Sequence, residues 1–403
     1  MAISDEITRL TNAKAAIKTA IEGKGVTVPS ATLLDGYAAL ITSIPSGGST
    51  NEISFPAWVK DGDTHLWLDI RDSYQLDQQI RIRMIGTIDW GDGSAAQSVS
   101  VTTYTTFTHT YAALGKYRID LHPTSGTFYL GGGNTTYNVM GTLSGRAHTV
   151  ASLYQAEIGT SRITILSTHS FYYCRGLIRV YVPSTIVDPK SSYVFGYCYA
   201  LKEVEFQDSS TITQTSGSGS MFAFCYSLQD VDGYAPPKTT ILSAIYRSCA
   251  ALGEIIIPPA VTTIQSNAIN GCSGLRTIYC LPTTPPTISA AADFAPPAAC
   301  VIKVPKGSLS SYQAGTTWSD YASQMEEAGA ITFTLTSVSS SNKARMVDLN
   351  ESYTTTLVPD TGKTLGTVTV KMGGTDITST AYSAGVVTIA SVTGNIEITA
   401  SAS

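Results

Sequence analysis

Five cysteines recur along the chain at an almost constant spacing of 23–27 residues, and each opens the same short phrase. A leucine follows each cysteine by three residues, a β-branched residue follows the leucine by three, and an apolar or aromatic residue precedes the cysteine by three. The five are Cys174, Cys198, Cys225, Cys249 and Cys272. A phrase repeated at this period predicts a solenoid, in which each copy forms one turn stacked on the next. Because solenoids present extended surfaces, the pattern favours binding over catalysis.

The chain has 7 cysteines, and packing explains them better than chemistry does. Equivalent positions of stacked repeats align, so we expect the repeat cysteines to form a column of small buried groups. An odd number of cysteines in so long a chain argues against a disulfide framework, and there is no C-x-x-C pair to suit a metal. Cys280 falls at a strand position and is expected in the core, whereas the pattern does not place Cys300.

The phrase [FYI]-x-x-C-x-x-L-x-x-[VI] resembles the leucine-rich repeats of the BspA type over about residues 150–325. That resemblance implies short repeats with one strand per turn. The segment from Val301 to Tyr321 looks like the closing cap of that family. Stacked repeats need such a cap to cover the last open core.

The composition bounds the classes of partner. Only 14% of the 403 residues are charged, against about 25% in an average soluble protein. The net charge is −5 and there is no basic run, so we expect no nucleic-acid partner. No apolar stretch approaches 18 residues, so we expect no membrane insertion. The N-terminus from Met1 to Glu6 lacks the basic and apolar regions of a signal peptide.

Residues 1–44 have the apolar spacing of two helices, and residues 45–51 form a Pro/Gly/Ser-rich linker. One interpretation is a small helical hairpin. The other is an attachment or oligomerisation segment, because about 45 residues bury too little core to fold alone. The stretch from Ile21 to Pro29, IEGKGVTVP, resembles the attachment region of phage appendage proteins. It implies that residues 1–44 bind other virion proteins in a homo-oligomer, with a trimer favoured.

Residues 52–122 alternate like strands and carry three short motifs: Trp90-Gly91-Asp92-Gly93, His109-Thr110-Tyr111 and Gly115-Lys116-Tyr117. Together they resemble the PKD domain, an immunoglobulin-like β-sandwich. We expect Trp90 in the core, a tight turn at Asp92-Gly93, and a hydrogen bond from the hydroxyl of Tyr111. Four aspartates suggest calcium, but no loop has the full calcium-binding spacing, so metal binding stays open; they are Asp61, Asp63, Asp89 and Asp92.

The remaining chain divides into two regions. Residues 123–328 are expected to form the solenoid with its caps, and residues 123–160 are a Gly/Thr-rich bridge into the first repeat. Residues 329–403 alternate strictly, as in Ile331–Leu335, and predict a β-sandwich. The stretch from Val368 to Thr378 resembles a bacterial immunoglobulin-like module found at the ends of phage and prophage surface proteins.

No catalytic motif stands out. The 5 histidines are scattered, and neither a H-E-x-x-H motif nor a nucleophile elbow is present. Paired carboxylates for glycoside hydrolysis are the remaining enzymatic alternative. We therefore expect no enzyme, no catalytic or metal residue and no cofactor.

Residues that alternate with the core positions of the repeat strands are expected to face outward. They form the candidate receptor-binding surface: Tyr181, Glu203, Glu205, Asp232, Glu254, Arg276 and Tyr279. The chain has 22 tyrosines, and many flank the repeat cysteines. Tyrosine is typical of binding surfaces, but these rings could equally fill the repeat cores.

The sequence thus predicts a mainly β, modular protein with an N-terminal helical segment, a PKD-like sandwich, a leucine-rich-repeat solenoid and a C-terminal immunoglobulin-like sandwich. Its function is expected to be that of a phage virion appendage, a tail or head fibre. Such a fibre would be assembled in the host cytoplasm and would bind a polysaccharide or protein receptor on the bacterial surface. The alternatives are a bacterial cell-surface adhesin and a purely structural or decorative virion protein.

Overall fold

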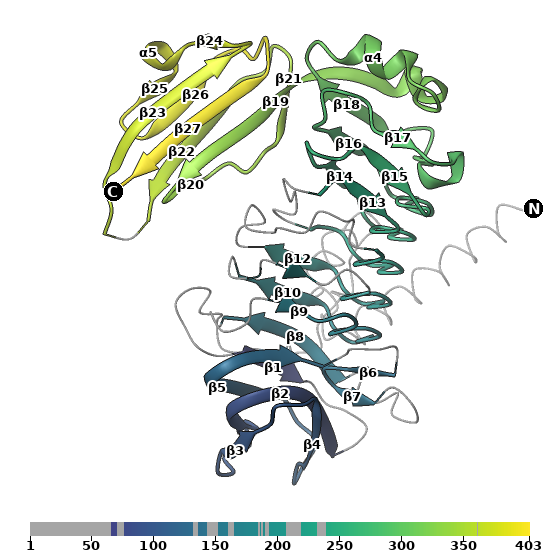
Figure 1. Ribbon diagram of the computed structural model, residues 1–403, viewed down its shortest axis with the longest axis vertical. Coiled ribbons are helices and arrows are strands. Elements are labelled where there is room, and N and C mark those ends of the chain that lie inside the picture. The colour runs from purple at the N-terminus through teal and green to yellow at the C-terminus, as the bar shows by residue number, and fades with distance from the viewer. Residues whose placement is uncertain are drawn as a thin grey trace, which may run out of the picture. The chain divides into compact units, whose positions relative to one another are not determined.

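The computed structural model describes residues 66–70, 76–131, 136–142, 152–159, 165–183, 186, 188–189, 193–206, 219–231, 239–360 and 362–403. These residues form a mainly β, modular protein with a β-solenoid in the repeat region, as the sequence predicts (Figure 1). The helical segment and linker expected at 1–44 and 45–51 lie outside the described residues. No helix among the described residues is long and apolar enough to cross a membrane.

The N-terminal strands form an antiparallel sheet around the long strand β2: they are β1 (Leu66–Ile70), β2 (Asp77–Asp89), β3 (Gln97–Ser100), β4 (Thr105–Thr110) and β5 (Tyr117–Leu130). Alternate residues of β2 point into the core, and Ile80, Ile82 and Ile88 are fully buried. Trp90 is also buried, as expected, and the hydroxyl of Tyr111 donates to its carbonyl at 2.8 Å.

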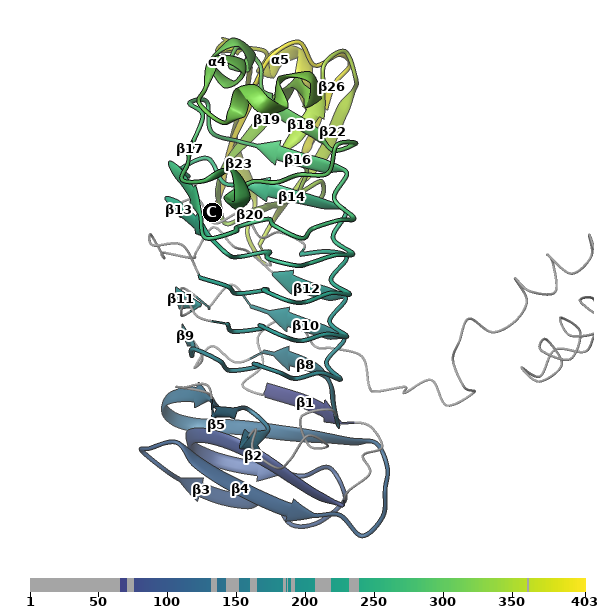
Figure 2. The same ribbon diagram turned by 90° about the vertical axis from the view of Figure 1, so that its right-hand side faces the viewer.

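This sheet continues into the solenoid without a break. β1 pairs antiparallel with β8 (Leu153–Ile158), the first strand of the solenoid (Figure 2). At the join, the buried carboxylate of Asp69 accepts two bonds from the guanidinium of Arg118, at 2.6 and 2.7 Å, and one from the side-chain amide of Gln155 at 2.7 Å. The domain boundary expected after residue 122 falls inside β5, because a hydrogen-bonded ladder need not end where the composition changes.

Each solenoid turn contributes a longer strand to one side. β10 (Arg179–Val182) pairs in parallel with β8 and with β12 (Glu203–Phe206), and β12 continues as a single bridge to Asp230. Further along, β14 (Glu254–Ile257), β16 (Thr277–Cys280) and β18 (Val301–Pro305) pair in the same way. Figure 2 shows β8, β10 and β12 stacked in order. We call this side the strand face.

Short strands lie on a second side of the solenoid. They are β9 (Ile165–Leu166), β11 (Asp188–Pro189), β13 (Ile241–Ser243), β15 (Thr263–Gln265) and β17 (Thr287–Ile288). Hydrogen-bonded turns containing Cys174, Cys198, Cys249 and Cys272 join β9, β11, β13 and β15 to the next longer strands. At the N-terminal end, β6 (Tyr137–Asn138) and β7 (Gly141–Thr142) form a small hairpin. The side-chain amide of Asn138 donates to the carbonyl of Tyr172 at 2.6 Å and so satisfies the first turn.

The repeat cysteines form the buried column that the sequence predicts, and they are at most 2% exposed. Four of the five thiols also donate to a carbonyl of the preceding turn: Cys198 to Phe171 at 3.0 Å, Cys225 to Phe195 at 3.0 Å, Cys249 to Phe222 at 3.1 Å and Cys272 to Tyr246 at 2.9 Å. A small side chain that can donate a weak hydrogen bond suits this position. Cys280 is fully buried, and Cys300 is buried beside the cap.

The last solenoid turn is covered by the 3-10 helix η2 (Ala291–Asp293), the helix α4 (Leu309–Ala314) and the 3-10 helix η3 (Trp318–Gln324). The indole of Trp318 donates to the carbonyl of Pro286 at 2.7 Å, and the hydroxyl of Tyr312 donates to the carbonyl of Pro282 at 2.9 Å. Both rings are buried. This arrangement closes the open end of the core, where the sequence predicts a cap.

The C-terminal region is a two-sheet sandwich with a core of its own. One sheet contains β27 (Ile396–Ala402) between β19 (Met325–Thr336) and β23 (Leu365–Met372), with β24 (Thr375–Asp376) at the edge. The other contains β20 (Val338–Ser340), β22 (Tyr353–Pro359), β26 (Val386–Ile389) and β25 (Tyr382–Ser383). The short strand β21 (Met346–Asp348) pairs with β19, and the helix α5 (Thr378–Ala381) precedes β25.

One strand, β19, belongs to both regions. Its first residues pair with β18 of the solenoid, Ile302 opposite Met325, and its last residues pair with β27 of the sandwich. The boundary expected after residue 328 therefore falls inside this strand. Asn395 reinforces the join, since its side-chain oxygen accepts from the backbone N–H groups of Lys306 and Ala330, each at 3.1 Å.

Candidate functional site

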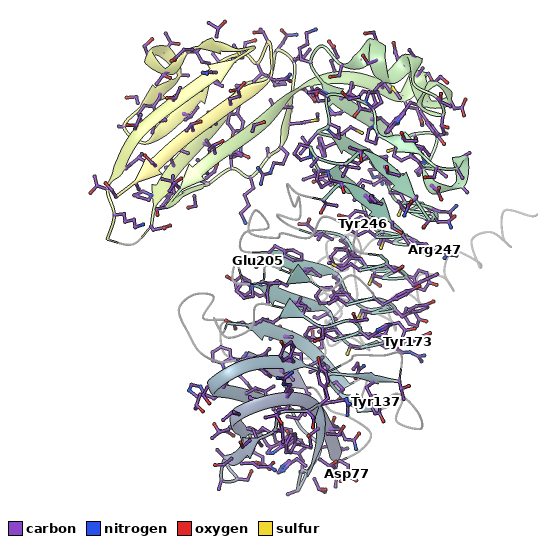
Figure 3. The ribbon with its side chains drawn as sticks, viewed as in Figure 1. Asp77, Tyr137, Tyr173, Glu205, Tyr246 and Arg247 are labelled. Carbon is purple, nitrogen blue, oxygen red and sulfur yellow. The ribbon has the colours of Figure 1, made fainter. Side chains whose placement is uncertain are left out.

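The strand face carries most of the candidate receptor-binding residues. Glu203 lies opposite Arg179 in the register of β12 and β10, and its carboxylate is 3.5 Å from the Arg179 Nε. Glu205 follows two residues later on the same side and is half-buried. Figure 3 shows it on the opposite side of the solenoid from Tyr173 and Arg247. These residues face outward, as the alternation along the strand predicts.

The prediction that Tyr181 belongs to this outward-facing surface is wrong. Tyr181 lies opposite Glu205 in the register of β10 and β12, yet its side chain is only 1% exposed, and its neighbour Glu157 on β8 is 0% exposed. The alternation itself holds, because Val180 and Val182 point into the core. A strand side is open to solvent only where nothing packs over it, and that condition fails at Tyr181. Asp232 lies outside the described residues.

Two of the remaining candidates lie together. The hydroxyl of Tyr279 on β16 is 3.5 Å from the carboxylate of Glu254 on β14, and burial together with that carboxylate raises the pKa of the tyrosine. Arg276 is exposed just before β16. Of the seven sequence-predicted residues, the structure thus brings Glu254 and Tyr279 into one place, leaves Arg276 apart from them, and aligns Glu203 with Glu205 on a more N-terminal strand.

Glu254 and Tyr279 line a hollow of about 250 Å³ between the strand face and the C-terminal sandwich. The solenoid wall adds Asp230, and the facing wall comes from the segment Lys343–Met346 that leads into β21. Acidic groups therefore stand on one wall and basic groups, from Lys343 and Arg345, on the other. The volume lies below the roughly 300–1,000 Å³ of drug-sized sites, so the hollow suits one small group of a larger ligand.

A lysine with acidic partners flanks this site. Lys303 on β18 bonds to Asp348 and lies 3.1 Å from the carboxylate of Glu326. Burial alone would lower the pKa of Lys303, but the hydrogen bonds to the two carboxylates outweigh it and raise the pKa. These contacts hold the solenoid against the strands that carry the basic wall.

The basic wall could not be predicted from the sequence pattern. Lys343 and Arg345 are far from the repeats in the chain, and nothing in their local pattern marks them, since it is the fold that brings their segment over β14. The sequence pattern also leaves open which tyrosines fill the core and which lie on the surface. Tyr246 fills the core, 5.8 Å from Phe222 in a stacked column, but most of the others lie in the turns and not on the strand face.

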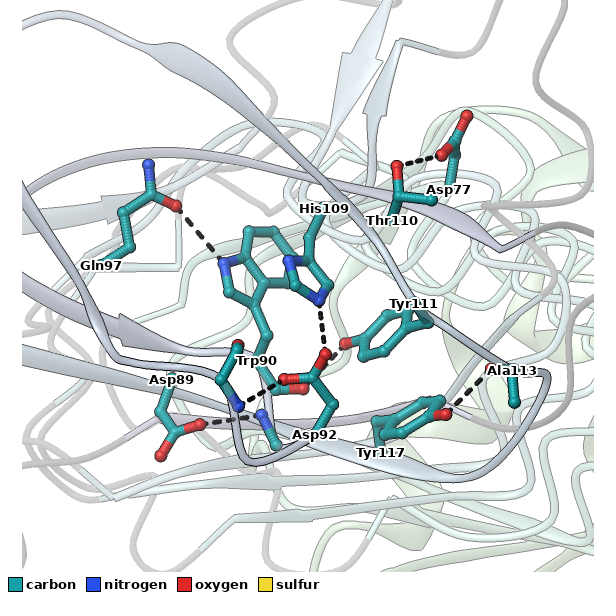
Figure 4. A network of polar contacts seen from close by, with 12 residues as sticks. Asp77, Asp89, Trp90, Asp92, Gln97, His109, Thr110, Tyr111, Ala113 and Tyr117 are labelled. Carbon is teal, nitrogen blue, oxygen red and sulfur yellow. Dashed lines mark hydrogen bonds and ion pairs between the residues drawn. The ribbon is translucent and has the colours of Figure 1, made fainter.

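A polar network surrounds the Trp90 motif (Figure 4). The ring of His109 stacks on Trp90 at 4.8 Å and bonds to the carboxylate of Asp92 at 2.8 Å. Hydrogen bonds from Ser94, and then the one to His109, lower the pKa of Asp92 to about 2. The carboxylate of Asp89 accepts from the backbone of Gly91. The network locks a turn, and no cluster of three or more potential metal ligands occurs in the described part of the chain.

Residues 164–291 match a family described as BspA type leucine rich repeat region, in 6 copies. The family that matches is a repeat family and not an enzyme family. No curated protein matches the chain.

Solved structures of repeat proteins are similar to parts of the chain. A Treponema pallidum leucine rich repeat protein is 21% identical with a TM-score of 0.28, and the match covers 35% of this chain and 65% of that one. A leucine rich cell surface protein of Faecalibacterium prausnitzii A2-165 is 27% identical with a TM-score of 0.30, covering 39% and 38%. The pneumococcal vaccine antigen PcpA is 12% identical with a TM-score of 0.24, covering 51% and 45%.

This chain spans less than two thirds of each of those chains, and TM-scores of 0.30 or below carry no functional assignment. What the comparisons establish is the repeat type. Residues 164–291 are BspA-type leucine-rich repeats.

Proposed function

We propose that the protein is a non-catalytic recognition protein that binds a ligand on a bacterial surface through the hollow between the strand face and the C-terminal sandwich. The observation that carries this proposal is that two modules meet around Glu254 and Tyr279, with acidic groups on one wall and basic groups on the other. Opposed charges beside the half-buried Tyr279 suit a polar ligand held by oriented hydrogen bonds.

Two settings fit such a protein. A bacterial cell-surface adhesin is favoured by the BspA-type repeats. A phage virion appendage, the second setting, is favoured by the attachment-like stretch from Ile21 to Pro29 and by the PKD-like motifs around Trp90. In that setting residues 1–44 bind other virion proteins, the protein is a homo-oligomer, and several weak sites on one particle act together. If no ligand binds, the interpretation that remains is a decorative virion protein.

The binding test uses the whole chain. Cutting at residue 150 would separate β1 from β8, which pair with each other and share one core. Fluorescently labelled protein is titrated onto candidate bacterial cells, and Glu254→Ala with Tyr279→Ala is compared with Glu205→Ala, which removes a strand-face carboxylate outside the hollow. We expect about tenfold weaker binding for the first variant and little change for the second.

Equal loss in both variants, or no loss in either, would reject the hollow as the binding site. The setting is tested separately with an antibody against the protein. Labelling of the surface of the producing bacterium supports the adhesin, whereas co-purification with virus particles supports the virion appendage.

A further inference from the structure

A second surface lies on the turns that connect the short and longer strands of the solenoid. In the first three repeats the residue before each cysteine is aromatic: Tyr173, Tyr197 and Phe224. Their rings stack from turn to turn, with centroids 4.6 Å apart between Tyr173 and Tyr197 and 4.5 Å apart between Tyr197 and Phe224. We call this surface, from five residues before to one residue after each cysteine, the aromatic turn face. Figure 3 shows Tyr173 on this side of the solenoid and Glu205 on the other.

The backbone sets this stack at some conformational cost. All three aromatic residues have a positive φ, between 59° and 65°. Their N–H groups donate to carbonyls of the following turn, that of Tyr173 to Gly196 and that of Tyr197 to Ala223, each at 2.9 Å. A non-glycine residue in this conformation costs about 1–3 kcal/mol, and Ser248 of the fourth repeat has it too, so the conformation belongs to the repeat turn. The fifth repeat has Gly271 at the position, so the fold itself does not need an aromatic residue there.

A second stack lies beside the first. Tyr199 and Tyr226, each one residue after a cysteine, have ring centroids 5.3 Å apart. Tyr226 is 46% exposed, and the equivalent residue in the next turn is the small Ala250. Among the described residues, the ring of Tyr226 contacts those of Tyr199 and Phe224. One face of Tyr226 is therefore open to a ligand, whereas the rings inside the stacks present their edges and hydroxyls.

The charge of this face is opposite in sign to that of the chain. The guanidinium of Arg175 lies 5.2 Å from the ring centroid of Tyr173, and that of Arg247 lies 5.2 Å from the centroid of Phe224. Both arginines are exposed. No acidic residue occupies these turns in any of the five repeats, although the whole chain has a net charge of −5; the turns are 169–175, 193–199, 220–226, 244–250 and 267–273.

The spacing of the two cations suits a linear ligand. Arg175 belongs to the first repeat and Arg247 to the fourth, so three inter-strand steps of about 4.8 Å, roughly 14 Å in total, separate their backbones. The turns of the second and third repeats, which lie between them, carry Tyr197, Tyr199 and Tyr226. Burial raises the pKa values of Tyr172, Tyr197 and Tyr199, so these hydroxyls remain protonated donors at neutral pH.

We propose that the aromatic turn face binds an anionic polysaccharide, a polymer rich in hydroxyl groups that carries carboxylate or phosphate groups. Arg175 and Arg247 bind two of the anionic groups, since guanidinium pairs with both chemistries. The tyrosine hydroxyls bond to sugar hydroxyls along the polymer, and the open face of Tyr226 stacks on one sugar ring. This site is separate from the hollow beside Glu254, so a test that rejects one of the two binding sites leaves the other proposal unaffected.

The test measures affinity of the whole protein by calorimetry at low and at physiological salt. The probes are oligogalacturonate for carboxylate, a poly(glycerol phosphate) chain for phosphate, and dextran as a neutral polymer. The variant is Arg175→Gln with Arg247→Gln. The matched control, Lys202→Gln with Lys363→Gln, removes two exposed cations outside the turn face.

We expect one or both anionic probes to bind, dextran to bind weakly or not at all, and the arginine variant to bind at least about tenfold more weakly than the control. Tyr226→Ala should weaken binding of oligogalacturonate several-fold, and unchanged melting curves show that the variants are folded. The probe that binds distinguishes carboxylate from phosphate. Binding of neither, equal loss in the control, or dextran binding as tight as that of the anionic probes would overturn the proposal.

Discussion

The two ends of the solenoid are joined to their neighbouring modules in different ways. At the N-terminal end, the antiparallel sheet and the repeats share one continuous hydrophobic core, which runs from Leu66 to Met325. At the C-terminal end, the sandwich has a separate core, and the join consists of the shared strand β19 and polar contacts. Shared apolar burial makes two modules unfold together, whereas a shared strand couples two cores that can each unfold alone. We therefore expect two unfolding transitions.

The largest loss of stability is expected from a substitution that leaves a cavity in the shared core. Phe195 is fully buried, between Phe171 at 5.4 Å and Phe222 at 5.6 Å in a stacked column. Phe195→Ala should lower the free energy of unfolding of the first core by about 3–5 kcal/mol and leave the second transition in place. Differential scanning calorimetry measures both, with Val370→Ala in the sandwich core as the reciprocal control. A single transition that moves in both variants would contradict the two-core description.

A smaller loss is expected from the polar join at the N-terminal end. Asp69→Asn removes the ion pair and leaves the Arg118 guanidinium, which is 13% exposed, without its buried carboxylate. Removing one partner of a buried ion pair costs about 3 kcal/mol. Urea unfolding followed by circular dichroism should show the first transition shifted, with Asp89→Asn at the exposed end of β2 as the control. An equal shift in the control would mean that the buried carboxylate of Asp69 contributes no more to stability than an exposed one.

The C-terminal join is tested by Asn395→Ala. This removes the side chain that bonds to Lys306 and Ala330 across the shared strand, at an expected loss of about 1–3 kcal/mol. We expect the two calorimetric transitions to move further apart, because the cores become less coupled. Asn342→Ala, whose bonds stay within the sandwich, should move the second transition only. If Asn395→Ala also moves only that transition, the side chain does not couple the cores.

The thiol column gives the first core a pH dependence. Burial raises the pKa values of Cys225 and Cys272 to about 12, from the ordinary thiol value of 9.0. Their contribution to stability is therefore complete below pH ~9 and is lost as the pH rises towards 12, because the unfolded chain releases these protons first. Urea unfolding at pH 8 and pH 10, with reductant, should show the loss. Replacing both cysteines with alanine should lower the stability of the first core and should also reduce the dependence of that stability on pH. An unchanged pH dependence would exclude these two thiols as its source.

The smallest effect is expected at the turn around Trp90. Asp92→Asn should lower stability at neutral pH by at most about 1 kcal/mol, because its hydrogen bond with His109 is near the surface. The pKa of Asp92 is lowered to about 2, so its contribution is present above pH ~4 and disappears as the pH falls towards 2. Thermal melts at pH 7 and pH 3 measure this, with Asp320→Asn in the cap as control. A loss that persists unchanged at pH 3 and below would argue against the carboxylate.

The sequence predicts the parts of the molecule that repeat. The cysteine column, the solenoid and the buried Trp90 follow from local spacing, because each turn has the same environment as its neighbours. The exposure of Tyr181 could not be predicted from β10 alone, since it depends on what packs over the strand. The basic wall of Lys343 and Arg345 depends on a contact between distant segments.

The domain boundaries illustrate the same limit. Composition changes near residues 122 and 328, but β5 and β19 run through both positions, because backbone hydrogen bonding does not depend on side-chain type. The helical attachment segment and its oligomeric state stay predictions from residues 1–44.

The strand β19 has a mechanical consequence. It pairs in parallel with β18 at one end and with β27 at the other. The hydrogen bonds on both sides run across the strand, so a tension along it loads them in shear, several at once and not one after another. A protein held at one module and pulled at the other would transmit that load through β19 while both cores stay folded. The part of the chain that resists a pull is thus neither module but the strand that they share.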